Sequence, residues 1–381
     1  MNEDKAARYH RLKRRAAVLS GALTAMVLGG LLLSGASLAL AGVARSITSA
    51  PAGAVALYVV MIAVVQEATA FPLVFYRSCF LERRYGLSSE PFGIWLRDHA
   101  KASAIGLVLA IAGAEVVYAL MRGLPAWWWL ASAAVFVAAM ALMAKLAPLV
   151  LMPLFYRFTP LDRESLRARL VALSGRAGVP VLGVYEWGLG EKSRRANAAL
   201  VGTGATRRII VSDTLLADYS EDEIEVILAH EIAHHVHRDI LMALAVESAL
   251  LVLAFFAAAR ALSAWGPAVG LTAQGDIAGL PLLVLAGGAI TLAATPLVNA
   301  LSRRNERRAD RYALAMTRQP AAFITAMKRL AAQNLAEENP APPVLWLFHS
   351  HPPIAERIEA ARRFGRESSS PTIEGAGQTK P

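Results

Sequence analysis

One short run of the sequence combines residue types and a spacing that could hold a metal ion. Residues 230–234 read HEIAH, so His230 and His234 are four residues apart. On an α-helix this spacing puts both imidazoles on one face, one turn apart, where they can bind one zinc ion. Glu231 is rotated away from that pair and is placed to act as general base toward a metal-activated water. The pattern predicts zinc-dependent hydrolysis; the alternative is a solvated helix face with incidental histidines.

The sequence does not supply a third metal ligand directly after this run. A catalytic zinc ion usually has three protein ligands and one open position. In the extended pattern HExxHxxGxxH a third histidine follows, but here His237 stands where Gly is required and Ile240 where His is required. We therefore expect a carboxylate from another part of the chain as the third ligand.

Two carboxylates are candidates for this third ligand. Glu247 lies on the apolar segment that follows HEIAH, whereas Glu306 lies on a later helix with Asp310 one turn beyond it. Glu306 is favoured, because Asp310 could then accept a hydrogen bond from a histidine ligand and orient its ring. The alternative for this later helix is an exposed face on which Arg303 and Arg307 form ion pairs with the two acids.

A clearly marked helix positions HEIAH. Ser220 can cap the first turn, Glu223 completes a capping box with it, and two further acids favour the positive end of the helix dipole. We therefore predict a helix over residues 221–236. A small α+β lobe is expected around it, with a helix at 165–173, strands at 181–187, 198–201 and 208–211, and later helices at 302–317, 322–335 and after Pro353.

Most of the remaining chain is apolar enough to lie in a membrane. The 381 residues are 56% hydrophobic and 18% charged, a composition too apolar for an ordinary soluble protein. Six runs reach the roughly 20 residues that a helix needs to cross the hydrocarbon core. They lie near residues 17–43, 54–76, 102–121, 126–152, 240–263 and 278–300. The predicted fold class is a mostly α polytopic membrane protein, with about six transmembrane helices and a small α+β zinc metallopeptidase lobe.

The basic residues indicate how these spans are oriented. The formal net charge of +10 could point to nucleic acid, but the Lys and Arg residues cluster at the ends of the apolar runs. Their distribution places both termini and the polar stretch 156–239 in the cytoplasm. We expect a lipid bilayer as a partner and no nucleic acid, and the single Cys79 excludes an intramolecular disulfide. The sequence specifies no oligomeric state.

Longer stretches resemble one family of membrane peptidases. Residues 302–310 read SRRNERRAD, which is similar to the SRxxExxAD signature of type I CAAX prenyl endopeptidases and their bacterial stress-protease relatives. Further similar stretches follow in the family's order: FYRSCFLERRYGL at 75–87, PLFYRFTPL at 153–161, RRIIVSDTLL at 207–216 and HPPIAERI at 351–358. The resemblance covers about residues 55–365, and HEIAH combined with the later ExxxD and the membrane spans is highly specific.

The resemblance implies a gluzincin site. In such a site His230, His234 and Glu306 hold one zinc ion, Glu231 activates water, and Asp310 supports the ligands. The expected enzyme is a membrane-embedded zinc metalloendopeptidase that hydrolyses peptide bonds of membrane-associated, prenyl-type or other peptide substrates at the cytoplasmic face. High Ala and Arg usage favours a bacterial inner-membrane protein.

Other site residues are also implied by the resemblance. His351 matches the family histidine thought to stabilise the tetrahedral oxyanion, which requires a hydrogen-bond donor near the scissile carbonyl. Its alternative role is to cap the helix after Pro352. Asn197 and Ala198 match an edge strand whose main chain aligns the substrate as an added β-strand, with a turn residue as the alternative for Asn197. Ala199 stands where the family usually has an aromatic residue, so this part of the cleft is expected to be more open.

Function and domain organisation follow from these observations. The main alternative function is a catalytically inactive zinc-dependent membrane binding or transport protein, and a metal-free membrane scaffold is the third. Glu231 argues against the inactive zinc protein, because a structural zinc site closes with four protein ligands and needs no adjacent carboxylate, and metal analysis would separate the metal-free scaffold. We expect an N-terminal membrane domain with four transmembrane helices at 1–153, a metallopeptidase domain with two more at 154–366, and a disordered tail at 367–381.

Polar residues inside the predicted spans point to a hydrated interior. Gln66 and Glu67 lie in the second apolar run, where buried polar groups are costly unless they face water or each other. The alternative is that these groups form paired contacts between helices. Eukaryotic members of the family have seven spans around a water-filled chamber, whereas we count six here.

Overall fold

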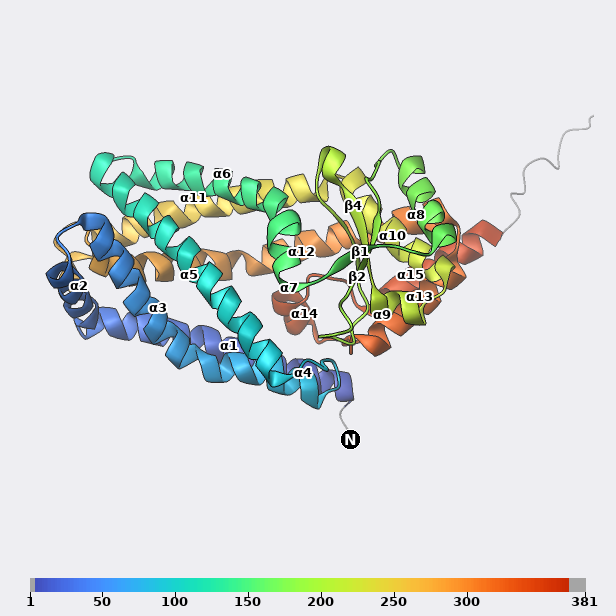
Figure 1. The fold of residues 1–381 in the computed structure, drawn as a ribbon, viewed down its shortest axis with the longest axis horizontal. Helices are drawn as coiled ribbons and strands as arrows, with labels where there is room; N and C mark the ends of the chain where they lie inside the picture. Colours follow the sequence, from blue (N-terminus) through green and yellow to red (C-terminus); the bar gives the residue numbers. More distant parts are fainter. Residues whose placement is uncertain (1–3, 370–381) are drawn as a thin grey trace, which may run out of the picture. The chain divides into compact units, whose positions relative to one another are not determined.

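The computed structural model of the protein describes residues 4–369 (Figure 1). The chain forms two compact units. The first comprises Met1–Arg157, Glu191–Arg194 and Asp239–Asn299, and the second comprises Phe158–Gly190, Arg195–Arg238 and Ala300–Pro381. The last helix, α15 (Ile354–Ser369), continues into the predicted disordered tail as far as Ser369. The remainder of that tail, 370–381, lies outside the described residues.

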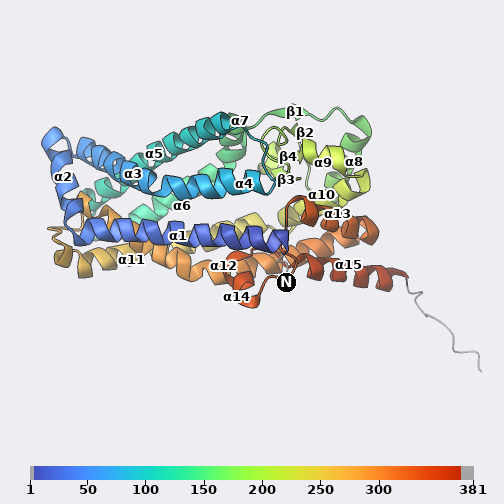
Figure 2. The same cartoon turned by 90° about the horizontal axis from the view of Figure 1, so that it is seen from below.

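Among residues 4–369, six helical segments are long and apolar enough to cross a membrane, as the sequence predicts. They are Lys5–Leu33 (α1), Pro51–Arg84, Phe92–Gly123 (α5), Trp128–Phe155, Asp239–Trp265 (α11) and Ile277–Thr317. The second segment consists of α3 (Pro51–Phe75), a π-helical turn (Tyr76–Phe80) and α4 (Leu81–Arg84), and the fourth of α6 (Trp128–Leu146), a π-helical turn (Ala147–Leu151) and α7 (Met152–Phe155). The sixth segment contains α12 (Leu280–Thr317). In the first unit α6 packs along α11 and α3 packs along α5 (Figures 1 and 2). Helices satisfy their backbone groups internally, which is the condition for crossing a bilayer.

The first predicted span has the wrong boundaries. The sequence predicts one span near 17–43, but α1 ends at Leu33 and the chain continues as the shorter α2 (Ala36–Ile47). Gly35 has a φ of +74°, a left-handed conformation that glycine adopts without strain, and it separates the two helices. Because the apolar composition runs through this break, hydropathy does not locate it.

A second boundary was also predicted wrongly. The apolar run 278–300 and the basic helix 302–317 are parts of one helix, α12, which extends from Leu280 to Thr317. The chain has no Gly or Pro at the junction around residue 301, so nothing interrupts the helical hydrogen bonds there. Pro296 lies inside the helix without ending it. The change from apolar to charged residues therefore marks a change of environment within one helix.

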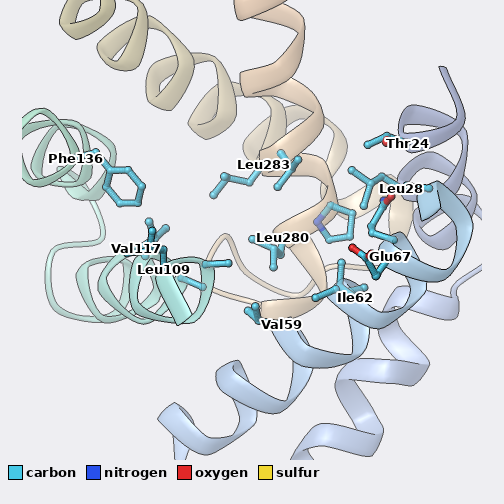
Figure 3. A pocket seen from close by; sticks show the side chains of 18 of the residues that line it. Thr24, Leu28, Val59, Ile62, Glu67, Leu109, Val117, Phe136, Leu280 and Leu283 are labelled. Atoms are coloured by element: carbon cyan, nitrogen blue, oxygen red, sulfur yellow. The ribbon is translucent and has the colours of Figure 1, made fainter. Parts of the chain in front are cut away.

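The first unit contains an apolar cavity of about 600 Å³. Figure 3 shows its lining side chains, which include Thr24 and Leu28 of α1, Val59, Ile62 and Glu67 of α3, Leu109 and Val117 of α5, Phe136 of α6, and Leu280 and Leu283 of α12. Gln66 also lines it. Glu67 Oε1 lies 2.6 Å from His99 Nε2, so this acid is both part of the cavity wall and paired with a neighbouring helix.

The second unit contains a four-stranded sheet with the order β1-β2-β4-β3. The strands are β1 (Phe158–Pro160), β2 (Val184–Trp187), β3 (Ala198–Val201) and β4 (Arg208–Ser212). β2 and β4 are parallel, whereas β1 and β3 pair antiparallel with their neighbours. Three strands lie where the sequence predicts them, but the short β1 was not predicted. β3 forms one edge of the sheet.

Helices surround this sheet in the second unit (Figures 1 and 2). They are α8 (Glu164–Arg176), α9 (Asp213–Asp218), α10 (Glu221–Val236), α13 (Pro320–Gln333), α14 (Pro342–Phe348), α15 and the end of α12. The main helices bury apolar residues at helical spacing, such as Leu166, Leu170 and Leu173 of α8 and Ile224, Leu228 and Ile232 of α10. α13 and α15 pack side by side. Helices α9 and α14 were not predicted, because six or seven residues show too little periodicity.

Candidate metal centre

Helix α10 carries the HEIAH run and begins as the sequence predicts. The Glu223 backbone N–H donates to Ser220 Oγ at 3.3 Å, and the Ser220 N–H donates to Glu223 Oε2 at 2.9 Å. This capping box satisfies two amide groups at the ends of the first turn. The helix then continues without a break through His230, Glu231 and His234. The two histidines therefore share one helix face.

Helix α12 brings a carboxylate to these two histidines. Glu306 Oε2 lies 3.3 Å from His230 Nε2, and Glu306 Oε1 lies 3.5 Å from His234 Nε2. One possible ligand atom from each of the three residues lies within 4.8 Å of the other two. His230 and Glu306 are buried, so this cluster faces the interior of the second unit.

The donor set and its spacing fit a zinc ion. Ligand atoms arranged tetrahedrally at about 2.0–2.1 Å from zinc lie about 3.3 Å from one another. The distances from the Glu306 oxygens to His230 Nε2 and His234 Nε2, 3.3 and 3.5 Å, are close to this value. Glu306 Oε2 is buried and accepts no well-directed hydrogen bond from residues 4–369, although histidine nitrogens lie near it. Leaving such an oxygen unpaired is costly unless a cation binds it. Two imidazoles and one carboxylate also leave a fourth coordination position open.

A second carboxylate orients one of the histidines. Asp310 Oδ1 lies 2.9 Å from His230 Nδ1. Arg357 of α15 donates to both oxygens of Asp310, from Nε at 2.8 Å and from Nη2 at 2.6 Å. This two-bond pairing fixes the carboxylate, so it can accept a hydrogen bond from Nδ1–H of His230. The lone pair of His230 Nε2 then points toward Glu306.

Neighbouring groups change the proton affinity of the site. Burial lowers the pKa of His230, but hydrogen bonds to Asp310 and Glu306 outweigh burial and raise that pKa to about 9. Zinc ligation requires an unprotonated ring nitrogen, so metal binding has to release this proton. Burial raises the pKa of Glu231, against the opposing charges of His230 and His234. A raised pKa makes the carboxylate a stronger proton acceptor near neutral pH.

The segment after α14 brings His351 to the same carboxylate. Its Nδ1 lies 2.8 Å from Glu306 Oε2, and its side chain is 63% exposed. Arg303 of α12 holds this segment, because its Nη1 donates to the main-chain oxygens of Leu345 at 3.0 Å and His349 at 2.6 Å. His351 is therefore an accessible histidine beside the cluster.

The residues expected to bind substrate lie at the edge of the sheet. Ala198 begins β3 and Asn197 directly precedes it. The Asn197 N–H donates to Ser212 Oγ at 3.0 Å, and its carbonyl accepts from the Ser212 N–H at 2.9 Å, so Asn197 continues the pairing with β4. His235 Nε2 lies 2.9 Å from the Leu200 carbonyl oxygen, which joins β3 to the metal-binding helix.

Three residues of this region were not singled out from the sequence: Arg357, His235 and Asn334. Arg303 was considered only as a member of ion pairs on an exposed helix face, whereas its side chain is buried and binds main-chain oxygens. Arg357 stands in the HPPIAERI run at 351–358, so the resemblance marked its segment but not its contact with Asp310. Arg303, His235 and Asn334 act through contacts with segments far away in the chain. A single sequence carries no local signal for such contacts.

Comparison with known proteins decides the family. Residues 160–364 match the model of peptidase family M48, and residues 2–157 match the model described as CAAX prenyl protease N-terminal, five membrane helices. The first match covers more than half of the chain. The chain belongs to peptidase family M48. It is a membrane-embedded metalloendopeptidase of a zinc-dependent family. Within 2–157 the described residues contain four long apolar helices and the shorter α2.

Named relatives of this M48 peptidase include both bacterial and eukaryotic proteins. It is 29% identical over 284 residues to "Uncharacterized metalloprotease YhfN" of Bacillus subtilis, a match that covers 73% of this chain and 66% of the relative. It is 26% identical over 302 residues to "CAAX prenyl protease 1 homolog" of Oryza sativa subsp. japonica, covering 77% of this chain and 70% of the relative. The chain thus spans about two thirds of these relatives' length.

A solved structure shares the fold. The crystal structure of S. mikatae Ste24p superposes with a TM-score of 0.82 at 21% sequence identity. The match covers 94% of this chain and 88% of that chain. At this identity the similarity shows the fold alone, and the roles of individual residues have to be argued from this chain.

Proposed function

We propose that His230, His234 and Glu306 hold the zinc ion of this endopeptidase and that Glu231 activates the attacking water. The observation that carries the proposal is the approach of two imidazole nitrogens and one carboxylate to within 4.8 Å of one another. Glu231 adds support, because it follows the first histidine on the same helix and a purely structural zinc site needs no such carboxylate.

Two residues near the cluster have different roles in the proposed hydrolysis. Glu231 takes a proton from the attacking water and then delivers it to the leaving nitrogen. Zinc, when bound, supplies a Lewis acid that polarises the scissile carbonyl and lowers the pKa of water. His351 donates a hydrogen bond to the developing oxyanion, a role that its exposure and its position beside Glu306 support.

Asp310 is proposed to orient His230. The contact of 2.9 Å between Asp310 Oδ1 and His230 Nδ1 supports this role, because it selects the tautomer whose Nε2 can bind a metal. Arg357 in turn fixes Asp310 through two hydrogen bonds. Asp310 therefore acts on the metal through the histidine rather than as a ligand.

The substrate is proposed to be a peptide or a segment of a membrane protein that binds along β3. Asn197 and Ala198 lie at the sheet edge, where an extended peptide can pair with the main chain. Several relatives are named CAAX prenyl proteases, so prenylated tails are one substrate class and unmodified membrane-associated peptides are another. The small Ala199 leaves room beside this edge for bulky substrate side chains.

The membrane is proposed to be a bacterial inner membrane, with both termini and the catalytic site on the cytoplasmic side. Lys and Arg residues lie in the first turns of α1, at the end of the second span and near the start of the third, which favours this orientation. A match to a Bacillus subtilis protein favours a bacterial source.

Removal of the third ligand tests the proposed site. Glu306→Ala is expected to reduce the zinc content far below about one ion per chain, because only two protein ligands would remain. Zinc is measured by mass spectrometry on purified, dialysed protein whose folding is checked by thermal unfolding. Glu247→Ala is the matched control and should retain its zinc. Loss of zinc from Glu247→Ala with normal zinc in Glu306→Ala would show that the third ligand is wrong.

The proposed orientation in the membrane predicts the side on which two positions of the chain lie. A reporter fused after Arg366 should read cytoplasmic, and a cysteine placed at Glu191 should be labelled only by reagents that reach the cytoplasm. The buried Cys79 is first replaced by Ser so that the new thiol alone reports. Periplasmic signals at both positions would contradict the six-span orientation.

A further inference from the structure

The register of the sheet fixes which groups of β3 face outward. The Ser212 N–H donates to the Asn197 carbonyl, the Asn197 N–H donates to Ser212 Oγ, and Ala199 lies opposite Ile210, so Asn197 and Ala199 point their main-chain groups toward β4. The even-numbered residues Ala196, Ala198 and Leu200 therefore point theirs away from the sheet. An added strand could hydrogen-bond only to this second set.

The outward groups of Ala196 are already bonded within the protein. The Ala196 N–H donates to Asn334 Oδ1 at 3.2 Å, and Asn334 Nδ2 donates to the Ala196 carbonyl at 3.3 Å. A side-chain amide that gives and accepts one bond in this way occupies the place of a peptide group in an added antiparallel strand. A substrate could reach Ala196 only by displacing both bonds.

The backbone of Asn334 is held firmly in this place. Asn334 is the C-cap residue of α13 (Pro320–Gln333), and its N–H donates to Leu330 O at 2.9 Å. The next residue, Leu335, adopts a left-handed φ of +49°, and the Ala336 N–H returns to Ala331 O at 2.8 Å. This helix end presents the amide of Asn334 to β3 in one orientation.

The opposite end of the same edge is partly occupied as well. The Leu200 carbonyl oxygen lies 2.9 Å from His235 Nε2, so it already has a partner on α10. Between these two positions, the outward N–H and C=O of Ala198 have no hydrogen-bond partner among the residues that the structure describes. Ala198 is 4% exposed, and unpaired main-chain groups are costly in such a place.

We propose that Asn334 ends the substrate-pairing edge of β3, so that a bound peptide exchanges a full pair of main-chain hydrogen bonds only with Ala198. Asn334 is then a specificity-determining residue: it limits how many substrate residues on one side are held by the sheet. This inference rests on the proposed binding of substrate along β3. It adds that the pairing is short because side chains of this chain occupy the neighbouring positions.

Backbone methylation of a peptide substrate tests the inference on the wild-type enzyme. The probe is a quenched fluorogenic peptide that the enzyme cleaves at one mapped bond, synthesised in versions that each carry one N-methyl group. The N–H that pairs with Ala198 should be sensitive, with kcat/KM reduced about 3- to 10-fold for one lost hydrogen bond. Methylation two residues away on either side should change kcat/KM less than about 2-fold, because Asn334 and His235 occupy those carbonyls.

Shortening the side chain at position 334 should extend the pairing. In Asn334→Ala the freed groups of Ala196 become available, so a second sensitive N–H should appear two residues from the first, again with about a 3- to 10-fold effect. Gln333→Ala is the matched control, since Gln333 lies at the same helix end but bonds to Tyr219 and Asp218. It should keep the wild-type pattern. Asn334→Ser, too short to bridge both groups of Ala196, serves if the Ala variant does not fold.

The outcomes separate this inference from the proposed function. A wild-type enzyme with no sensitive N–H at all would overturn substrate pairing along β3, and the inference with it. The wild-type enzyme is expected to be sensitive to methylation of one N–H. If a folded Asn334→Ala or Asn334→Ser variant is then sensitive at the same single N–H and at no second one, only the role of Asn334 is overturned. Two sensitive N–H groups in the substrate of the wild-type enzyme would also overturn the role of Asn334, and this result needs no variant.

Discussion

The substitution Glu231→Gln is expected to lower peptide turnover by about two to four orders of magnitude while zinc content stays at about one ion per chain. The amide has nearly the same shape as the carboxylate but cannot accept a proton from water. The proposed ligands His230, His234 and Glu306 are untouched, so metal binding should persist. Turnover of a defined peptide and zinc content are measured on the same preparation.

The position of Glu231 on α10 supplies a matched control. Glu221 begins the same helix, and its side chain is 41% exposed, so Glu221→Gln makes the same chemical change away from the metal cluster. It should retain turnover near the wild-type value. Substantial residual turnover in Glu231→Gln, with normal zinc content and normal folding, would contradict the role of this carboxylate as general base.

Local patterns predict the metal-binding helix well. Its limits at Glu221 and Val236 agree with the sequence analysis, because Ser220 and Glu223 form a capping box whose partners are three residues apart. The spacing of His230 and His234 on one face follows from helix geometry alone. Interactions over three or four residues leave a readable signal, since both partners fall within one or two helical turns.

Long-range contacts are the part that the sequence does not reveal. Asn334 meets Ala196 across 138 residues, and Arg357 meets Asp310 across 47. Each is an ordinary polar residue on a helix until the fold brings its partner near. The break at Gly35 was missed for a different reason: the apolar run continues through it, and one backbone conformation decides where α1 ends.

The substitution His351→Ala is expected to reduce the catalytic rate by about two to three orders of magnitude while zinc content stays intact. This imidazole lies beside the proposed metal site, with Nδ1 2.8 Å from Glu306 Oε2, and its exposed ring is available to a bound substrate. Loss of one preorganised donor to an oxyanion removes stabilisation that exists mainly in the transition state. The effect should therefore fall on kcat more than on KM.

Two other roles for His351 give different results. If the ring only caps the following helix, its loss should cost about 1 kcal/mol of unfolding free energy and little turnover in the folded protein. If the ring is a metal ligand, zinc should fall together with activity. Zinc stoichiometry, melting temperature and turnover, all measured on one preparation, separate these cases.

His349 is the control that decides whether the correct histidine was chosen. It lies two residues before His351, but its Nε2 is 3.3 Å from Glu337, and its main-chain oxygen accepts from Arg303. The Arg303 bond does not depend on the side chain, so His349→Ala should keep the segment in place and retain most turnover. Loss of activity in His349→Ala with intact zinc and folding, together with normal turnover in His351→Ala, would assign the oxyanion contact to His349, because the imidazole that stabilises the transition state is the one whose removal slows the reaction.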